Sequence, residues 1–436
     1  MTRTLDQWLD YQQRVHALGV DLGLKRVRAV WQRMGAPRPA PVVITVGGTN
    51  GKGSTVAFLE AMLAAAGKHV GCYTSPHLLR YNERVRIDGA DADDAALVAA
   101  FERIEAARGE IPLTYFEFGT LAALDLCARA DLDVAVLEVG LGGRLDAVNI
   151  IDADTAIVTT IGLDHMDWLG NDRDSIGREK AGIFRAGRPA VIGESDPPHG
   201  LLEAARALGA GLLRADRDFH ASVQDGRWRW CGWRVGADAP PEIDLPAPAL
   251  EAPCQIANAA AAVAALYALR DRLGWDARAI ARGVTAARVR GRLEHLGGDP
   301  QLVVDVAHNP QAAAVLAAWL DAHPSRGRVL AAYGALSDKD VAGVAAALGA
   351  RIAHWHLGGL AAVTPRGLPA DELAARLRAG LPDAAISAHA DMAAALAAAR
   401  AAAQPGDRIL AFGSFYVAAA ALRSAAAAAA PARAQV

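Results

Sequence analysis

Short apolar runs alternate with longer stretches of helical period over residues 42–193. Each apolar run has the length of a buried strand, and the stretches between the runs predict helices. The alternation predicts an α/β domain with a doubly wound, mostly parallel sheet. In such a sheet the ligand crevice lies at the carboxyl ends of the strands. The expected strands are 42–46, 69–73, 133–139, 155–160 and 189–193.

The segments that flank this alternation have other patterns. Residues 5–34 predict two short helices joined by residues 20–24. Residues 211–250 contain tryptophans interleaved with Arg and Gly, followed by prolines. We interpret this segment as a small antiparallel sheet, and a nucleic-acid platform of stacked aromatic rings is the less favoured alternative. Helices at 252–273 and 276–287 are expected to complete the first domain.

A second alternation of apolar runs and helical stretches begins near residue 301. It predicts a smaller, Rossmann-like α/β domain that follows the first. We expect the two domains to span residues 1–289 and 290–436. The expected strands of the second domain are 301–306, 328–332, 352–357, 384–388 and 408–412.

Composition narrows the class of protein. The chain has 436 residues, of which 53% are hydrophobic and 21% charged, with a formal net charge of −3. This composition is typical of a globular protein. Because the net charge is not positive, nonspecific binding to nucleic acid is not expected. The four cysteines form no C-x-x-C pair and indicate thiols of a reducing compartment. Because the sequence shows neither a secretory signal nor a strongly apolar span, we expect a soluble, cytoplasmic protein that binds no membrane. We also expect a monomer.

Residues 46–54, of sequence VGGTNGKGS, follow one expected strand and precede a stretch of helical period. A strand, a glycine-rich turn and a helix start are typical of the phosphate-binding loop (P-loop) of ATP-binding proteins. Lys52 would bridge the β- and γ-phosphates, and the hydroxyl of Ser54 or Thr55 would reach Mg²⁺. A valine replaces the first glycine of the usual pattern and a glycine follows the lysine, so a structural or Rossmann-type turn is the alternative. The predicted nucleotide-binding residues of this loop are Thr49, Asn50, Gly51, Lys52, Gly53, Ser54 and Thr55.

Further motifs follow the phosphate loop in order along nearly the whole chain. Together they resemble the ATP-dependent amide ligases of the Mur ligase superfamily and, within it, the bacterial dihydrofolate synthase/folylpolyglutamate synthase family. The glycine after Lys52 is the folate-branch variant of the loop, where Mur enzymes usually carry Thr. The motifs are YTSPHL (73–78), NER (82–84), YFEFGT (115–120), LEVGLGGRLDA (137–147), GLDH (162–165), REKAGI (178–183), DVAHNP (305–310) and FGSFY (412–416).

In this family ATP phosphorylates a carboxylate, and an amine then attacks the acyl phosphate. One divalent ion can bridge the phosphates and a second can screen the carboxylate, so two Mg²⁺ sites are implied. Glu138 ends a very apolar run, where an unpaired carboxylate would be costly, and a cation partner is therefore expected. The resemblance implies that the metal ligands are Ser75, Glu138 and His165. A structural salt bridge for Glu138 and a turn-forming role for Ser75 are the alternatives.

Lys180 lies in an Arg-Glu-Lys segment that, by composition, is an ordinary solvated helix turn. In the enzymes that the chain resembles, the matching lysine can be carbamylated by CO₂, which converts a cation into a carboxylate-like group. That reaction needs the neutral amine, and burial or nearby cations would have to lower the lysine pKa. The resemblance implies this carbamate on Lys180, and it implies that the catalytic residues are Lys52, Lys180, Arg292 and His308.

The resemblance also implies the substrate-binding residues. Residues 21–27 resemble the pterin-site segment of the bifunctional enzymes, although Lys25 stands where an acidic residue is expected. Two phenylalanines could stack on the pterin or aminobenzoate ring, and packing in the core is an equally open interpretation. Further nucleotide contacts are implied for Asn258, Arg292 and Asp305. The folate residues would be Asp21, Leu22, Gly23, Leu24, Arg26, Phe116, Phe118, Leu145, Asp146 and Ala147, and the glutamate residues His308 and Ser414.

The sequence therefore predicts an ATP-dependent ligase that adds L-glutamate to dihydropteroate and to tetrahydrofolate (poly)glutamates through an acyl phosphate. A Mur-type ligase acting on a nucleotide-linked peptide is one alternative; the glycine after Lys52 and the lack of a separate uridine-nucleotide domain argue against it. A P-loop ATPase that does not ligate is the other alternative. The second α/β domain with its Asp305 and His308 motif is hard to explain on that view.

Overall fold

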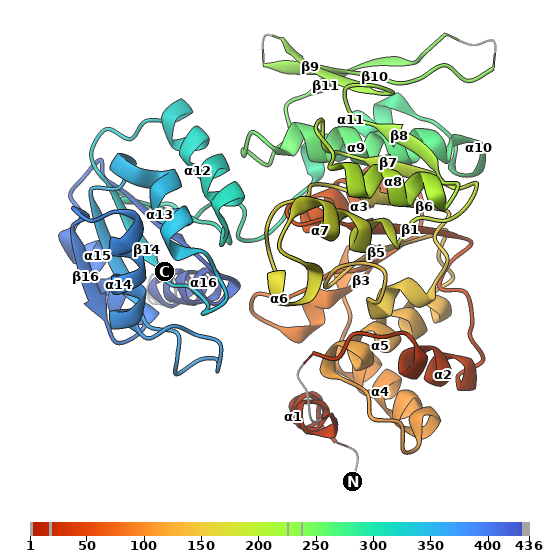
Figure 1. Ribbon diagram of the computed structural model, residues 1–436, viewed down its shortest axis with the longest axis horizontal. Coiled ribbons are helices and arrows are strands. Elements are labelled where there is room, and N and C mark those ends of the chain that lie inside the picture. The colour runs from red at the N-terminus through yellow and green to blue at the C-terminus, as the bar shows by residue number, and fades with distance from the viewer. Residues whose placement is uncertain (1–2, 17–19, 225, 237–238, 430–436) are drawn as a thin grey trace, which may run out of the picture. The chain divides into compact units, whose positions relative to one another are not determined.

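The computed structural model describes residues 3–16, 20–224, 226–236 and 239–429 (Figure 1). By its contacts the chain divides into two compact units. The first unit runs to Ala249 and includes Gln255–Arg288, and the second comprises Leu250–Cys254 and the chain from Val289 onwards. The short segment 250–254, which the sequence analysis assigns to the first domain, thus groups with the second unit.

The first unit is built on one large sheet. Within its described residues, eight strands have the order β4-β3-β2-β5-β1-β6-β7-β8. The strands from β2 to β8 in this order are parallel, and β3 and β4 form an antiparallel edge, which confirms the predicted mostly parallel sheet. The strands are β1 (Val42–Gly47), β2 (Val70–Tyr73), β3 (Val85–Ile87), β4 (Ala90–Asp91), β5 (Val134–Glu138), β6 (Thr155–Val158), β7 (Pro189–Ile192) and β8 (Gly211–Arg214).

Helices bury the apolar side chains of this sheet. Every residue of β1 and β5 is buried, as expected for central parallel strands. Alternate residues such as Val43 and Leu137 face a core formed with α1, α2, α4 and α5. The helices are α1 (Leu5–Val15), α2 (Lys25–Arg33), α3 (Lys52–Ala65), α4 (Asp94–Arg108), α5 (Tyr115–Arg129), α6 (Met166–Leu169), α7 (Arg173–Ala181), α8 (His199–Ala207), α9 (Gln255–Ala268), α10 (Arg270–Leu273) and α11 (Ala277–Ala286), with 3₁₀ turns η1 (Tyr81–Arg84) and η2 (Ala147–Ile150).

The small antiparallel sheet predicted for residues 211–250 occupies only part of that segment. Strand β8 instead extends the main sheet, because it pairs in parallel with β7. The antiparallel sheet consists of β9 (His220–Gln224), β10 (Arg227–Cys231) and β11 (Glu242–Pro246), and it packs next to α9 and α11 (Figure 1). Trp228 and Trp230 are buried in it, so they serve its packing and offer no exposed stacking platform.

The second unit is a smaller α/β unit. Within its described residues, six strands have the order β12-β13-β17-β14-β15-β16; β12 is antiparallel and the others are parallel, which confirms the predicted second α/β domain. The elements are β12 (Glu294–His295), β13 (Gln301–Val304), α12 (Pro310–Ala322), β14 (Val329–Tyr333), α13 (Val341–Leu348), the 3₁₀ turn η3 (Gly349–Arg351), β15 (His354–Gly358), α14 (Ala370–Gly380), β16 (Ile386–His389), α15 (Met392–Ala402), β17 (Arg408–Phe412) and α16 (Phe415–Ala429).

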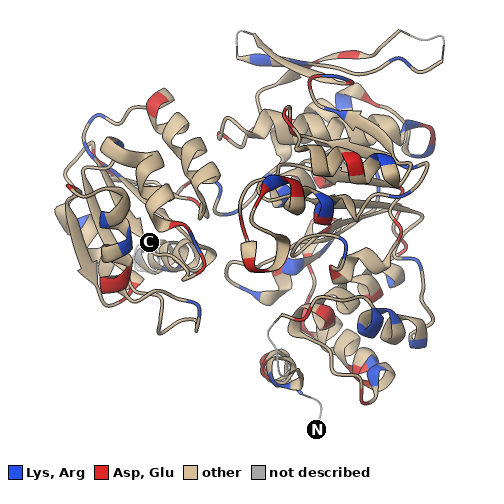
Figure 2. Ribbon diagram, in the orientation of Figure 1, with Lys and Arg blue, Asp and Glu red and all other residues tan. Residues whose placement is uncertain are grey.

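Charges of both signs are interspersed along the elements of each unit (Figure 2). The four cysteines are free thiols, and Cys72 and Cys127 are buried. Among the helices that the structure describes, each is too short or too polar to span a lipid bilayer.

Candidate active site

A glycine-rich loop joins β1 to the start of α3. Gly51 is the residue before the helix and has a φ of 87°, a left-handed conformation that favours glycine. A Cβ atom on Gly51 would also collide with Oδ1 of Asn258, which lies on α9. The turn therefore needs glycine for its backbone conformation and for its close approach to Asn258. This geometry brings the predicted nucleotide contact Asn258 next to the phosphate loop.

The segment that follows β6 holds the phosphate loop in place. The Thr49 N–H donates to the carbonyl of Thr160 at 2.7 Å, and the Thr49 Oγ1 accepts from the Gly162 N–H at 3.0 Å. The Thr159 hydroxyl donates to the carbonyl of Asn50 at 2.6 Å. Thr159 and Thr160 thus fix the loop backbone. The sequence analysis did not single them out, because isolated threonines after a strand carry no motif.

Lys52 and the two hydroxyl residues lie in the first turn of α3. The Lys52 Nζ donates to the carbonyls of Gly48 and Thr49, at 3.1 and 3.2 Å, and so folds back over the loop. The Thr55 hydroxyl donates to the carbonyl of Gly51 at 3.0 Å, within its own helix turn. This bond leaves Ser54 as the better candidate for a metal-facing hydroxyl.

Lys180 is buried against the phosphate loop. Its side chain lies on α7, and its Nζ donates to the carbonyl of Gly48 at 3.0 Å, which is also an acceptor for Lys52. Desolvation and the nearby Lys52 cation lower the pKa of Lys180 to about 7, against the opposing effects of Asp164 and Asp146. The reading from composition, a solvated helix turn, is therefore wrong for this residue. A substantial fraction of its amine is neutral near neutral pH.

Glu138 is a buried carboxylate at the carboxyl end of β5. It is 4% exposed, and its Oε2 accepts from the Ser75 N–H at 3.4 Å. A Cβ atom on Gly53 would lie 3.7 Å from the same Oε2, so the carboxylate faces the phosphate loop. The structure thus brings Ser75, Glu138 and the loop together at the edge where the parallel strands end.

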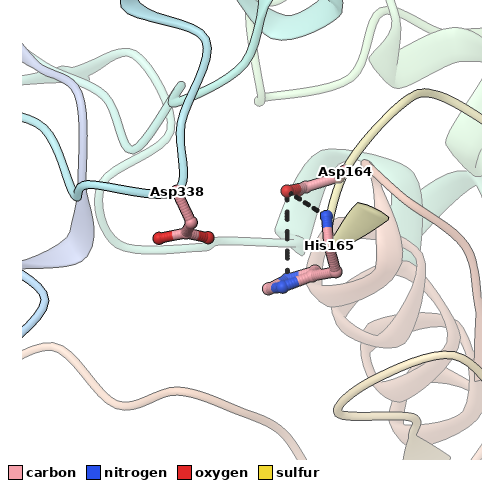
Figure 3. A group of neighbouring side chains, drawn as sticks. All are labelled: Asp164, His165 and Asp338. Carbon is pink, nitrogen blue, oxygen red and sulfur yellow. Dashed lines mark hydrogen bonds and ion pairs between the residues drawn. The ribbon is translucent and has the colours of Figure 1, made fainter. Parts of the chain in front are cut away.

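His165 follows β6 and precedes the short helix α6. Its backbone has a φ of 51°, and its side chain is about one-third exposed. The carboxylate oxygen Oδ1 of Asp164 accepts from the His165 N–H at 2.9 Å and lies 4.0 Å from Nε2 (Figure 3). Because Asp164 also acts on the pKa of Lys180, this pair belongs to the same electrostatic environment as the buried amine. The sequence analysis noted Asp164 in its motif but gave it no role.

The predicted pterin-site segment is organised by Arg26. Its Nη1 pairs with the Asp21 carboxylate at 2.6 Å, and its Nη2 donates to the Asp21 carbonyl at 2.7 Å. The same guanidinium lies 3.2 Å from the buried carboxylate of Glu117, at the start of α5. Residues 22–24, between the two paired residues, are half-buried. This network links the segment to the YFEFGT motif through Glu117, a residue to which the sequence analysis gave no role.

The two phenylalanines of that motif have different environments. Phe116 is half-buried, its ring lies 6.1 Å from that of Tyr73, and a Cβ on Gly140 would collide with it. Phe118 has no exposed surface and packs in the core of α1, α2, α4 and α5. The structure therefore corrects the assignment of Phe118 as a stacking residue: it is a core residue, because the face of α5 that carries it is covered.

Asp146 is a buried carboxylate next to the phosphate-loop lysine. Its Oδ2 accepts from the Leu141 N–H at 2.8 Å, and its Oδ1 accepts from the Val148 N–H at 3.0 Å. Desolvation raises its pKa to about 6, although these backbone bonds and Lys52 oppose the rise. Its neighbours Leu145 and Ala147 are half-buried and buried.

The remaining candidates lie in the second unit. Asp305 is buried and accepts from the Leu293 and Ala307 N–H groups at 2.9 and 2.7 Å; burial raises its pKa, and Arg292 opposes the rise. The Arg292 guanidinium lies 5.6 Å from the ring centre of Phe415. The His308 Nδ1 is 2.9 Å from the carbonyl of Val306. Ser414 is buried at the start of α16, where its hydroxyl accepts from the Val417 N–H at 3.2 Å.

Two family models match the chain. The Mur ligase middle domain matches residues 46–207, and the glutamate ligase domain of the Mur ligases matches residues 291–415. The chain is 46% identical over 413 residues to dihydrofolate synthase/folylpolyglutamate synthase of Escherichia coli, which covers 94% of this chain and 93% of that protein.

Solved structures give the same likeness. One is E. coli FolC in complex with DHPP and ADP, with a TM-score of 0.90 and 44% identity over 98% of this chain and 99% of that chain. Another is a bifunctional folylpolyglutamate synthase/dihydrofolate synthase with Mn, AMPPNP and L-glutamate bound. Its TM-score is 0.86, with 45% identity over 97% of this chain and 98% of that chain.

Proposed function

Because the chain belongs to the dihydrofolate synthase/folylpolyglutamate synthase family of the Mur ligases, we propose that it is an ATP-dependent ligase acting on folates. It joins L-glutamate to dihydropteroate and adds further glutamates to tetrahydrofolate (poly)glutamates. The observation that carries the proposal is the position of Glu138, a buried carboxylate that faces the phosphate loop and accepts from Ser75. A divalent ion held there would lie where a nucleotide phosphate meets a substrate carboxylate.

The nucleotide is assigned to the phosphate loop. The N–H groups of residues 51–54, at the start of α3, face its phosphates, Lys52 neutralises charge on the transferring phosphoryl group, and Asn258 contacts the nucleotide beside Gly51. Ser75, Glu138 and His165 would hold two Mg²⁺ ions, which supply charge neutralisation and hold the phosphate next to the carboxylate. The Ser75 hydroxyl and the Glu138 carboxylate fit this task, because oxygen atoms are the ligands that Mg²⁺ prefers.

Lys180 is assigned a carbamate. Its buried amine has a pKa of about 7 and is therefore available to CO₂ near neutral pH. An ammonium at this place would repel bound metal ions, whereas a carbamate would attract them and also accept hydrogen bonds. Asp164 and Lys52 lie in the same environment and set the balance between the two forms.

Folate and glutamate are assigned to separate sets of residues. Asp21, Arg26 and the half-buried residues between them hold the pterin end, with Phe116 as the stacking ring and Leu145–Ala147 as pocket wall. In the second unit, Arg292 and Asp305 serve the nucleotide, and His308 and Ser414 serve the incoming glutamate. Residues 1–289 then form the ATP- and folate-binding domain and residues 290–436 the glutamate ligase domain.

The reaction follows from these assignments in two balanced steps. An oxygen of the substrate carboxylate attacks the γ-phosphorus, the bond to the β-phosphate oxygen breaks, and ADP leaves with the electron pair. The amine of glutamate then attacks the acyl carbon, loses a proton and displaces inorganic phosphate. The protein contributes positioning, charge neutralisation and exclusion of water from the acyl phosphate.

An assay of coupled products tests the proposal. The protein is incubated with ATP, Mg²⁺, L-glutamate and dihydropteroate, and ADP and the new amide are quantified together. Equal amounts of both, each dependent on both co-substrates, are expected. ADP without an amide would indicate an ATPase, and activity only on a nucleotide-linked peptide would indicate a Mur-type ligase. A cytoplasmic location and a monomeric state stay predictions, and the free thiols are consistent with the former.

A further inference from the structure

Glu83 belongs to the NER motif (82–84), to which the proposed function gives no role. It is half-buried in the 3₁₀ turn η1, and its carboxylate accepts hydrogen bonds from three consecutive backbone N–H groups. Leu78 donates to Oε2 at 2.7 Å, and Leu79 and Arg80 donate to Oε1 at 2.9 and 2.8 Å. One side chain thus fixes the far end of the loop that follows β2.

The bonds of Glu83 go beyond helix capping. In a capping box, a glutamate or glutamine in the first turn reaches back to one backbone N–H, that of the N-cap residue. Glu117 does so at the start of α5, where it accepts from the Thr114 N–H at 2.8 Å. Glu83 makes the corresponding bond to Arg80, but it also accepts from two N–H groups that precede the turn. These two further bonds hold the loop itself.

The two ends of this loop are joined as well. The Thr74 N–H donates to the carbonyl of Arg84 at 2.8 Å. Arg86, on β3, donates from Nη1 to the Thr74 hydroxyl at 3.2 Å and to the carbonyl of Glu83 at 3.3 Å. The loop therefore closes on itself, and groups of the chain determine its backbone conformation.

The same loop carries Ser75, which is assigned to the metal ions. The Ser75 N–H donates to Oε2 of Glu138 at 3.4 Å, and this carboxylate faces the phosphate loop. The loop therefore begins at one carboxylate and ends at a second, that of Glu83. Because a bond of 3.4 Å is long and weak, it constrains Ser75 less than the three shorter bonds to Glu83 constrain the loop backbone.

We propose that Glu83 is a positioning residue that fixes residues 75–80 so that the Ser75 hydroxyl is held beside Glu138 for a divalent ion. This inference rests on the proposed function, which assigns Ser75 and Glu138 to the metal ions. Residues that orient metal ligands without touching the ion typically change metal affinity by about 10- to 100-fold. Glu83 acts through the backbone, since a loop that is already ordered spares the ion the entropy of ordering it.

Binding of Mn²⁺ in the presence of AMPPNP tests the proposal, with free Mn²⁺ measured by EPR. The variants are Glu83→Gln, Ser75→Ala and the combination of both. Glutamine keeps the size of the side chain but has one acceptor oxygen in place of two, so at least one N–H group of the loop loses its partner. Glu83→Gln should weaken Mn²⁺ binding about 10-fold. In the Ser75→Ala background it should weaken binding no further, because its effect passes through Ser75.

Asp93→Ala is the matched control. The Asp93 carboxylate accepts from the Ala96 N–H at 2.7 Å and caps α4, so this variant also deletes a bond between a carboxylate and the backbone, but outside residues 75–80. It should lower the thermal midpoint of unfolding and leave Mn²⁺ affinity unchanged. Unchanged Mn²⁺ affinity in Glu83→Gln, or an equal loss with and without the Ser75 hydroxyl, would overturn the proposal and give Glu83 a purely structural role.

Hydrogen–deuterium exchange of the wild-type protein provides a test that needs no variant. Without metal and nucleotide, the amides of residues 78–80 should exchange slowly, because Glu83 already holds them. Addition of Mn²⁺ and AMPPNP should change their exchange less than about twofold. Amides that become protected only when the metal is added would show that the ion orders the loop, and would overturn the proposal.

Failure of the proposed function would give a different result. If wild-type protein bound no Mn²⁺ in the presence of AMPPNP, or if Ser75→Ala bound it as tightly as wild type, the assigned metal site would fail and this inference with it. Binding that depends on Ser75 but is indifferent to Glu83 would overturn the inference alone.

Discussion

Replacement of Lys180 by alanine should nearly abolish turnover but leave ATP binding largely intact. The phosphate loop keeps its glycines and Lys52 in this variant, so nucleotide affinity should change little. The loss follows from removal of the carbamate, which supplies negative charge beside the metal ions. We expect turnover to fall by about 100-fold or more, the size seen when a charge partner of a transition state is removed. Added acetate should restore part of the activity by occupying the vacated space.

The burial of Lys180 determines how much of its amine is neutral and able to react with CO₂. An ordinary lysine has a pKa of 10.5, whereas that of Lys180 is lowered to about 7. At pH 8 roughly nine-tenths of Lys180 is then neutral, against about 0.3% of an ordinary lysine, a gain of about 300-fold. Carbamate formation, and the activity that depends on it, should therefore rise as the pH rises through about 7. In CO₂-depleted buffer, activity should fall, and bicarbonate should restore it.

Two assays check this prediction. Turnover is measured from pH 6 to 9 with and without bicarbonate, and ¹³C NMR of protein equilibrated with ¹³C-bicarbonate looks for a carbamate signal. Lys68→Ala, at a half-buried lysine beyond the end of α3, is the control and should behave as wild type. An identical carbamate signal in wild type and Lys180→Ala, or activity indifferent to bicarbonate at every pH, would refute the reasoning.

Four further predictions concern neighbouring residues and stability. Lys52→Ala should lower turnover about 100-fold in a coupled ADP assay, because it removes charge from the transferring phosphoryl group; near-normal turnover would contradict the loop assignment. Gly51→Ala should weaken binding of a fluorescent ATP analogue, since its Cβ would collide with Asn258 and its φ of 87° disfavours alanine. Asp21→Asn should raise the KM for dihydropteroate more than that for ATP, because it loses the pair with Arg26; equal changes would argue against a pterin role. In CO₂-free buffer and between pH 7 and 10.5, Lys180 binds more protons in the unfolded chain than in the folded protein. Its contribution to the free energy of unfolding should therefore rise with pH, by up to about 1.4 kcal/mol per pH unit. Urea titrations should show this slope in the wild type and not in Lys180→Met.

The sequence predicts most of the fold because its central strands are uniformly apolar. Residues 42–44 and 134–137 are uninterrupted apolar runs, a pattern typical of buried parallel strands. Strand β8 was wrongly assigned to the antiparallel sheet. None of its four residues is fully buried, so its sequence pattern is weak, and its pairing with β7 depends on tertiary contacts. The edge strands β3 and β4 have three and two residues, too few for a periodic signal.

For the candidate site too, the sequence predicts some features and not others. The phosphate loop is readable from the sequence, because only its glycines allow the turn that the structure shows. The burial of Lys180 is not, since neighbouring Arg and Glu predict a solvated turn and only the packing of α7 on the loop decides otherwise. Phe118 shows the reverse case, in which an aromatic residue of a functional motif belongs to the core. Glu117 forms its ion pair with Arg26, a partner distant along the chain, which the sequence pattern does not reveal.

The fate of one oxygen atom tests the central claim, that ATP activates a folate carboxylate as an acyl phosphate. Dihydropteroate labelled with ¹⁸O in its carboxylate is incubated with the protein, ATP, Mg²⁺ and L-glutamate, and the inorganic phosphate is analysed by mass spectrometry. The account predicts that each phosphate released with a new amide carries one ¹⁸O atom from the carboxylate. Phosphate that contains only oxygen from ATP and water would contradict it, because the γ-phosphate would then have passed to water and not to the folate.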